Sequence, residues 1–301
     1  MDFDINVIEN EEKLIELIKS DRVGEFTCLI DALSCLDVNS DLEKQELLSL
    51  IPHLELTCLS PTDHREQIKR LFDNTDFDFF GTTYRVAGVC SFTNLLDLMN
   101  EYNGSKRVKN VVVAAGFPHS QMPLEAKKEE VRYAIDHGAD EIDICLNRAL
   151  FLCGNQTKAA EEISDLKDLI VCRRREVVLK VILETGELQT LSNVWRASLL
   201  ALKSGADFIK TSTGKTQPAA TLEAALVMCK TIKEYYDKTG IKVGFKPAGG
   251  ISTTEDAVKY YTIVRTILGE EWMNNTLFRF GASRLANNLL SSIYKKEVKY
   301  F

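Results

Sequence analysis

From His53 onward, short apolar runs alternate with longer amphipathic stretches. Apolar runs of this length, bounded by turn residues, are typical of buried strands. Eight runs have this character: 54–58, 85–91, 110–115, 141–145, 177–183, 207–211, 242–245 and 277–280. We therefore expect eight short strands.

The segments between these runs have helical periodicity. The clearest are 124–137, 158–169, 191–203, 221–237 and 254–268. Strands that alternate with helices predict a parallel sheet, and eight such units favour an α/β fold closed as a TIM (β/α)8 barrel. An open, doubly wound sheet is the alternative, but it would normally place a glycine-rich turn after its first strand, where this chain has Ser60-Pro61-Thr62-Asp63.

The first 50 residues predict a different organisation. Apolar positions in 10–19 and 40–51 have helical spacing, Asn10 and Ser40 are suitable caps, and no strand pattern precedes His53. We expect an N-terminal helical extension over 1–50 and a barrel domain over 51–301. The tail from Tyr294 to Phe301 is expected to be solvated and flexible, with Tyr300 in it.

Composition and net charge limit the classes of function that this chain can have. The chain has 301 residues, 45% apolar and 27% charged, with a net charge of -7, which argues against a nucleic-acid or anionic-membrane surface. No secretory signal pattern and no membrane-length apolar run is present, so we expect a cytoplasmic protein. Its eight cysteines include no CxxC pair and no histidine at metal spacing. We therefore predict that the cysteines are free thiols and that the protein uses neither a metal nor a cofactor.

Two lysines close apolar runs in front of glycine-containing turns. Lys210 precedes Thr211-Ser212-Thr213-Gly214, and Lys246 precedes Pro247-Ala248-Gly249-Gly250. A buried ammonium loses solvation and a second one nearby opposes its charge, so we expect one of the pair to have a lowered pKa. A neutral lysine amine attacks carbonyl groups, which indicates imine (Schiff base) chemistry.

A repeated motif relates these lysines to a carboxylate. Gly-Ala-Asp-x-Ile occurs at 138–142 and at 205–209, and each copy ends in a charged residue, Asp143 or Lys210. Equivalent positions on alternate barrel strands share one interior layer, and Lys180 on the strand between them can point inward too. A buried ion-pair network with only a structural role is the alternative.

Each of the last two predicted strands is followed by a glycine-containing turn, in which few side chains cover the backbone. Gly249 and Gly250 follow one, and Gly281 and Ser283 follow the other. Free N–H groups at such turns bind phosphate, and in TIM barrels the loops after the seventh and eighth strands often do so. Thr211 to Lys215 adds hydroxyls and a cation but lacks the spacing of a nucleotide P-loop.

The motifs EID at 141–143, LKVILETG at 179–186, FIKTSTGK at 208–215, GFKPAGG at 244–250 and RFGAS at 279–283 resemble those of the deoxyribose-phosphate aldolase family. The resemblance covers about 50–290 in the same order. It implies a class I aldolase on a TIM barrel that cleaves 2-deoxyribose 5-phosphate to acetaldehyde and glyceraldehyde 3-phosphate without a metal.

By motif match, Lys210 would form the Schiff base, and Asp143 and Lys246 would transfer protons. Lys180 would tune Asp143 or order the pocket, and Thr57 would face the substrate. The substrate phosphate would lie on the turns formed by Gly214, Lys215, Gly249, Gly250, Gly281 and Ser283. The resemblance implies a small phosphorylated sugar as the partner. The oligomeric state is left open, with a homodimer weakly favoured.

Three positions depart from the motif pattern of the family: Glu55 stands in place of an aspartate, Ser120 in place of a glycine, and Arg284 in place of a small hydroxyl residue. Arg284 would either bind phosphate or point into solvent. A phosphate-binding barrel isomerase and a non-catalytic scaffold are the competing functions. Borohydride would not trap an isomerase, and a scaffold would usually have lost one of Lys210, Lys246 and Asp143.

Overall fold

Eight parallel strands form the centre of the computed structural model, which describes residues 44–104, 108–174 and 176–301. They pair in the order β10-β1-β4-β5-β6-β7-β8-β9. Their bounds are β1 Leu54–Thr57, β4 Gly88–Phe92, β5 Lys109–Val113, β6 Glu141–Cys145, β7 Val178–Ile182, β8 Phe208–Lys210, β9 Gly244–Lys246 and β10 Phe280–Gly281.

Backbone hydrogen bonds between β9 and the segment around β10 close the sheet. Phe245 N donates to Leu277 O at 2.9 Å, and Arg279 N donates to Phe245 O at 3.2 Å. Gly281 N donates to Pro247 O at 3.0 Å. The TIM-barrel prediction is therefore confirmed, and the open-sheet alternative is wrong.

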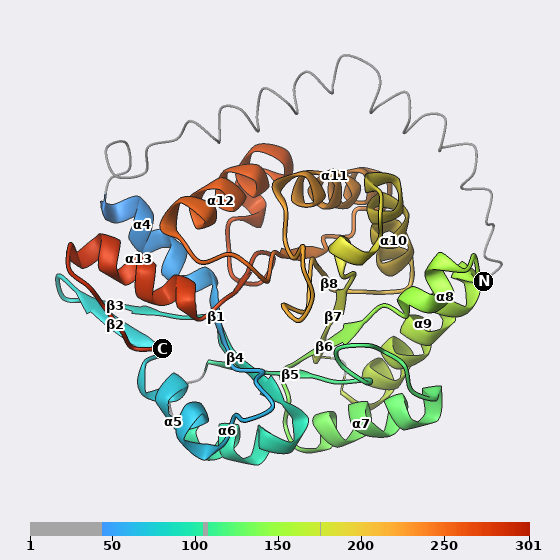
Figure 1. Ribbon diagram of the computed structural model, residues 1–301, viewed down its shortest axis with the longest axis horizontal. Helices are drawn as coiled ribbons and strands as arrows, with labels where there is room; N and C mark the ends of the chain where they lie inside the picture. Colours follow the sequence, from blue (N-terminus) through green and yellow to red (C-terminus); the bar gives the residue numbers. More distant parts are fainter. Residues whose placement is uncertain (1–43, 105–107, 175) are drawn as a thin grey trace.

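Helices surround this sheet (Figure 1). They are α5 Arg65–Asp73, α6 Leu96–Asn103, α7 Leu124–Asp136, α8 Arg148–Leu152, α9 Gln156–Arg173, α10 Leu191–Lys203, α11 Leu222–Thr239, α12 Thr254–Leu268 and α13 Arg284–Tyr294. The five helices predicted from periodicity correspond to α7, α9, α10, α11 and α12. Side-chain caps begin several of them: Thr253 and Asp256 form a capping box on α12, and Thr221 caps α11.

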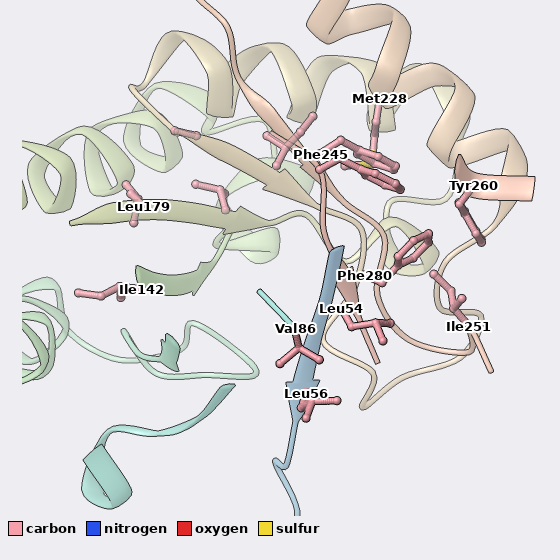
Figure 2. Close-up of a cluster of buried hydrophobic side chains, with 14 of the residues drawn as sticks. Leu54, Leu56, Val86, Ile142, Leu179, Met228, Phe245, Ile251, Tyr260 and Phe280 are labelled. Atoms are coloured by element: carbon pink, nitrogen blue, oxygen red, sulfur yellow. The ribbon is translucent and has the colours of Figure 1, made fainter. Parts of the chain in front are cut away.

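Alternation along the strands separates an apolar layer from a charged one. In β6, Ile142 and Ile144 belong to the main hydrophobic cluster, whereas Glu141 and Asp143 are buried and charged. Leu54 and Leu56 of β1 likewise join that cluster (Figure 2). Since side chains on a strand point alternately to its two faces, the charged residues occupy the barrel interior and the apolar ones pack beneath the helices.

A hairpin that the sequence patterns did not predict lies between α5 and β4. Strands β2 (Asp76–Phe79) and β3 (Thr82–Arg85) pair antiparallel through a turn at Phe80 and Gly81, whose φ angles are 51° and 81°. Positive φ at both central residues is the geometry of a tight hairpin turn. The alternation Asp-Phe-Asp-Phe was the available signal; the predicted strand 85–91 instead merged the end of β3 with β4.

The described part of the N-terminal extension is helical. Helix α4 (Lys44–Leu50) leads into a 3-10 turn, Ile51–His53, and buries Leu47 and Leu48. The predicted helix at 10–19 and the first residues of 40–51 lie outside the described residues. No helix among those described is long and apolar enough to span a membrane.

The C-terminal tail is exposed over most of its length, Tyr300 included, as expected, but hydrogen bonds tether its end to α13. Asn287 of α13 accepts hydrogen bonds from Tyr300 N and Phe301 N and donates one to Phe301 O. The Tyr300 ring stacks on Phe77 of the hairpin. Since the hairpin precedes β4, these contacts hold Tyr300 beside the element that leads into the barrel strands.

Candidate active site

Four interior side chains on neighbouring strands converge in the barrel. Asp143 lies opposite Lys180 across β6 and β7, and Lys210 lies opposite Lys246 across β8 and β9. Lys210 and Lys246 are the last residues of their strands. The structure thus brings together the four residues that the motif repeat and the strand ends single out.

The Asp143 carboxylate joins the three ammonium groups. Its Oδ1 accepts a hydrogen bond from Lys180 Nζ at 2.8 Å, and its Oδ2 accepts from Lys210 Nζ and Lys246 Nζ, each at 2.8 Å. All four side chains are at most 3% exposed. Asp143 therefore lies between the lysines.

Three further charged residues extend this network. Glu55 contacts Lys246 and lies 3.5 Å from Lys180 Nζ. Glu141 Oε2 lies 2.6 Å from Lys180 Nζ, and Glu141 Oε1 lies 2.8 Å from Arg279 Nη2. The sequence analysis identified Glu55 only as a departure and assigned no role to Glu141 or Arg279. The spacing along the strand could have identified Glu141: it lies two residues before Asp143, so both side chains point to the same face of the sheet.

The network has one more cation than it has carboxylates: Lys180, Lys210, Lys246 and Arg279 against Glu55, Glu141 and Asp143. A net charge of this kind is costly in a buried setting. Loss of one lysine proton would balance it.

Ion pairing outweighs burial in setting the pKa values. Burial disfavours the charged form of Glu141, yet Lys180 and Arg279 prevail and lower its pKa to about 2. Burial likewise opposes ionisation of Asp143, but the three lysines hold its pKa well below its usual range.

Burial lowers the pKa of Lys210, whereas the Asp143 carboxylate raises it, and the net result lies above the ordinary lysine value. The expected lowered pKa of Lys210 is therefore wrong for this arrangement. The physical reason is that Asp143 is interposed between Lys210 and Lys246 and contacts both.

Lys210 is the least compensated of the three lysines. Within the described part of the chain, it has an ion pair with Asp143 alone, whereas Lys180 pairs with three carboxylates and Lys246 with two. Its side chain is also 3% exposed, against 0% for the other two. Lys210 thus has the fewest carboxylate partners and the largest solvent access of the three lysines.

Two glycine turns meet above these lysines. Gly214 and Gly249 have φ angles of 78° and 82°, and a Cβ on Gly249 would lie 3.2 Å from Gly214 Cα and 2.9 Å from Ala219 Cβ. Gly250, with φ of 81°, continues the turn. Glu184 fixes the β8 turn by accepting from Thr213 N and Thr213 Oγ1. The backbones of the two turns therefore lie close together at the carboxyl ends of β8 and β9.

Gly281 makes room for the Lys246 side chain. A Cβ there would lie 3.0 Å from Lys246 Cε and 2.8 Å from Ala248 Cβ. Gly281 therefore has a packing role in addition to the phosphate-binding role predicted from the sequence.

The ends of β1 and β10 are joined. Thr57 N donates to Ser283 Oγ at 2.6 Å, and Ser283 Oγ donates to Thr57 O at 2.7 Å. Lys215 Nζ reaches across the mouth to donate to Leu59 O. The hydroxyl of Ser212 is buried and has no hydrogen-bond partner among the described residues. Thr57, Ser283 and Lys215 therefore belong to the same rim.

Two departures from the family pattern have structural explanations. Ser120 has a φ of 59°, a value that favours glycine, and the buried Lys127 donates to its hydroxyl at 2.8 Å. Arg284 is exposed at the first residue of α13.

One group of possible metal ligands lies in the barrel: Glu55, Cys90 and Asp143. Both carboxylates are already paired with lysines, and burial raises the pKa of Cys90 to about 12, which keeps its thiol protonated. A metal needs deprotonated ligands without competing cations, so this donor set fits one poorly.

Comparisons with known proteins relate this chain to aldolases. The sequence profile of the DeoC/LacD family aldolases matches residues 57–266. The deoxyribose-phosphate aldolase of Homo sapiens is 37% identical over 269 residues, which cover 85% of this chain and 83% of the human protein. That of Mus musculus is 36% identical over the same shares.

Solved structures share the fold. A protein of Toxoplasma gondii ME49 superimposes with a TM-score of 0.73 at 19% identity, over 84% of this chain and 96% of its own. The deoxyribose phosphate aldolase of Aeropyrum pernix, described as a tetramer, has a TM-score of 0.65 at 23% identity, over 87% and 95%.

Proposed function

The chain belongs to the DeoC/LacD family of aldolases, and on that basis we propose that it is a deoxyribose-phosphate aldolase. The reaction is the reversible cleavage of 2-deoxy-D-ribose 5-phosphate to acetaldehyde and D-glyceraldehyde 3-phosphate. The single observation that supports it best is the convergence of Lys180, Lys210 and Lys246 on Asp143. Among barrel enzymes, an interior lysine that can shed its proton is what imine chemistry requires.

Lys210 is the proposed nucleophile. Asp143, 2.8 Å away, first takes up one proton of the Lys210 ammonium, and the neutral amine then attacks the aldehyde carbon of the open-chain sugar. A second proton passes from the nitrogen to the oxygen of the adduct, which gives a neutral carbinolamine. Asp143 then returns its proton to the carbinolamine hydroxyl, which leaves as water, and the nitrogen lone pair forms the cationic imine on Lys210.

The imine acts as an electron sink. Asp143, again a carboxylate, takes the proton of the sugar C3 hydroxyl; the C2–C3 bond breaks and its electrons move toward the imine nitrogen, which releases glyceraldehyde 3-phosphate and leaves an enamine. Asp143 then returns this proton to the enamine carbon, and addition of water to the resulting imine releases acetaldehyde and the Lys210 ammonium. In this scheme Lys246 and Lys180 keep their charge and hold the two Asp143 oxygens in place.

The substrate phosphate is proposed to lie on the rim formed by Gly214, Gly249 and Gly250, with Lys215 at one side. The positive φ angles and close backbone approach of the two turns suit an anion held by N–H groups. Ser283, Thr57 and Gly281 complete the mouth at β1 and β10. We also infer a cytoplasmic location; the homo-oligomer stays a prediction.

Incubation with deoxyribose 5-phosphate and identification of the products by NMR tests this function. We expect equal amounts of acetaldehyde and glyceraldehyde 3-phosphate, and none from Lys210→Arg. A pentose phosphate isomer as product would indicate an isomerase, and no turnover by well-folded protein would indicate a scaffold; either result contradicts the proposal.

A further inference from the structure

A cavity of about 330 Å³ lies at the amino-terminal mouth of the barrel. Lys109, Glu141, Val178 and Phe208 line it, and each is the first residue of its strand. Lys210 is the last residue of β8. Because the strands are parallel, the cavity lies at the end of the barrel opposite the proposed substrate mouth.

The charges around this cavity are mainly positive. Arg85, Lys109 and Arg279 line it together with one acid, Glu141. Both Glu141 oxygens are already engaged, by Lys180 and by Arg279. Asp76 pairs with Arg85, whereas Lys109 has no ion pair within the described ranges. Arg279 likewise pairs with Glu55 and Glu141, so Lys109 is the cavity cation that no described carboxylate neutralises.

The interior network increases this positive character. It contains four cations and three carboxylates, and Arg279 is its member at the cavity. Charges at a poorly solvated site interact more strongly than in water. An anion beside Arg279 would compensate the excess charge that the barrel encloses.

The rest of the cavity wall combines an apolar part with two neutral polar residues, Asn275 and Thr276; the apolar part is formed by Val86, Ala87, Val178 and Phe208. A volume near 300 Å³ is at the lower end of small-molecule sites and exceeds what a bare phosphate fills. The expected occupant therefore carries a small organic or second phosphate group as well as its charge.

We propose that this amino-terminal cavity binds a small phosphate-bearing dianion, such as a phosphomonoester or a diphosphate, at a second site separate from the substrate mouth. Lys109 and Arg85 are the groups that reach the anion from the rim, and Arg279 forms its charged floor. None of the proposed catalytic steps uses Lys109 or Arg85.

Isothermal titration with inorganic pyrophosphate tests this site. Lys109→Ala should weaken binding about tenfold, because one charge-assisted contact is lost. Lys158→Ala, which removes an exposed lysine on α9 away from the cavity, is the matched control and should bind as the wild type does.

A fourth protein, Lys215→Ala, separates the two ends of the barrel: binding at the amino-terminal cavity survives this change. The proposal is overturned if the wild type binds no pyrophosphate, if Lys109→Ala and Lys158→Ala bind equally, or if Lys215→Ala abolishes binding. Since the readout is binding rather than turnover, its failure leaves the proposed aldolase activity untouched.

Discussion

Asp143 governs the chemistry of the site at the scale of single residues. It contacts Lys180, Lys210 and Lys246 at 2.8 Å each, and it raises the pKa of Lys210 against the effect of burial. The effect of Lys246 on Lys210 therefore passes through the carboxylate that both contact.

Replacing Asp143 with asparagine should separate proton transfer from lysine basicity. Without the carboxylate, burial dominates and the pKa of Lys210 falls, so the imine with acetaldehyde forms at lower pH than in the wild type. Turnover should fall by about 10² to 10⁴-fold because the proton acceptor is lost. Borohydride trapping rates and turnover, both measured against pH, check the two effects.

Asp136→Asn is the control for this change, since Asp136 pairs with Arg173 on the surface. It should alter neither profile. A trapping profile for Asp143→Asn that is unshifted, or shifted to higher pH, would show that Asp143 does not set the basicity of Lys210.

Lys246→Leu should act in the opposite direction. Removing the ammonium beside Asp143 strengthens the pull of that carboxylate on the Lys210 proton, so the pKa of Lys210 rises. A smaller fraction of amine is then present at each pH, and activity appears at higher pH. A turnover profile that keeps its wild-type position would count against this role.

At the scale of elements, the glycine turns after β8 and β9 should govern phosphate recognition. Gly249→Ala combines a φ of 82° with a Cβ placed 3.2 Å from Gly214 Cα. The turns must move apart, so we expect KM for deoxyribose 5-phosphate to rise about tenfold or more, while imine formation with unphosphorylated acetaldehyde changes little.

Gly240→Ala offers a matched control on α11. Its φ is 70°, and a Cβ there meets nothing within 4 Å. It therefore carries a similar backbone penalty, about 1 kcal/mol, without disturbing the mouth. Equal effects of the two substitutions on KM would exclude a phosphate site at Gly249.

Sequence patterns predicted these elements unevenly. Strand β6 and helices α10 and α12 have the predicted bounds, because apolar periodicity and capping residues agree there. The β2–β3 hairpin was missed because Phe80, an unusual residue at positive φ, occupies its turn. Lys210 and Lys246 were recognisable at their strand ends, but the interposition of Asp143, which raises the pKa of Lys210, depends on side-chain geometry that no local motif encodes.

At the scale of the whole molecule, the interior network links stability to pH. The pKa of Glu141 is lowered to about 2, so its ionisation stabilises the fold fully above about pH 4.5, and this contribution is lost as pH falls toward 2. Glu141→Gln should lower the free energy of unfolding at pH 7 by about 3–5 kcal/mol, because Lys180 and Arg279 lose a buried partner.

Urea unfolding from pH 7 to pH 3 measures this effect. The wild type should lose stability below about pH 4.5 more steeply than Glu141→Gln does. The control, Glu176→Gln, removes an exposed partner of Arg174 and should follow the wild type. Parallel pH dependences for wild type and Glu141→Gln would refute the buried contribution.

The central claim is that Lys210 is the residue that carries the substrate. Borohydride reduction in the presence of deoxyribose 5-phosphate, followed by peptide mapping, tests it most directly. The account predicts one substrate-derived adduct on Lys210, absent from Lys210→Arg. An adduct on Lys246, on Lys180 or only on surface lysines, or no adduct from protein that turns over its substrate, would contradict it.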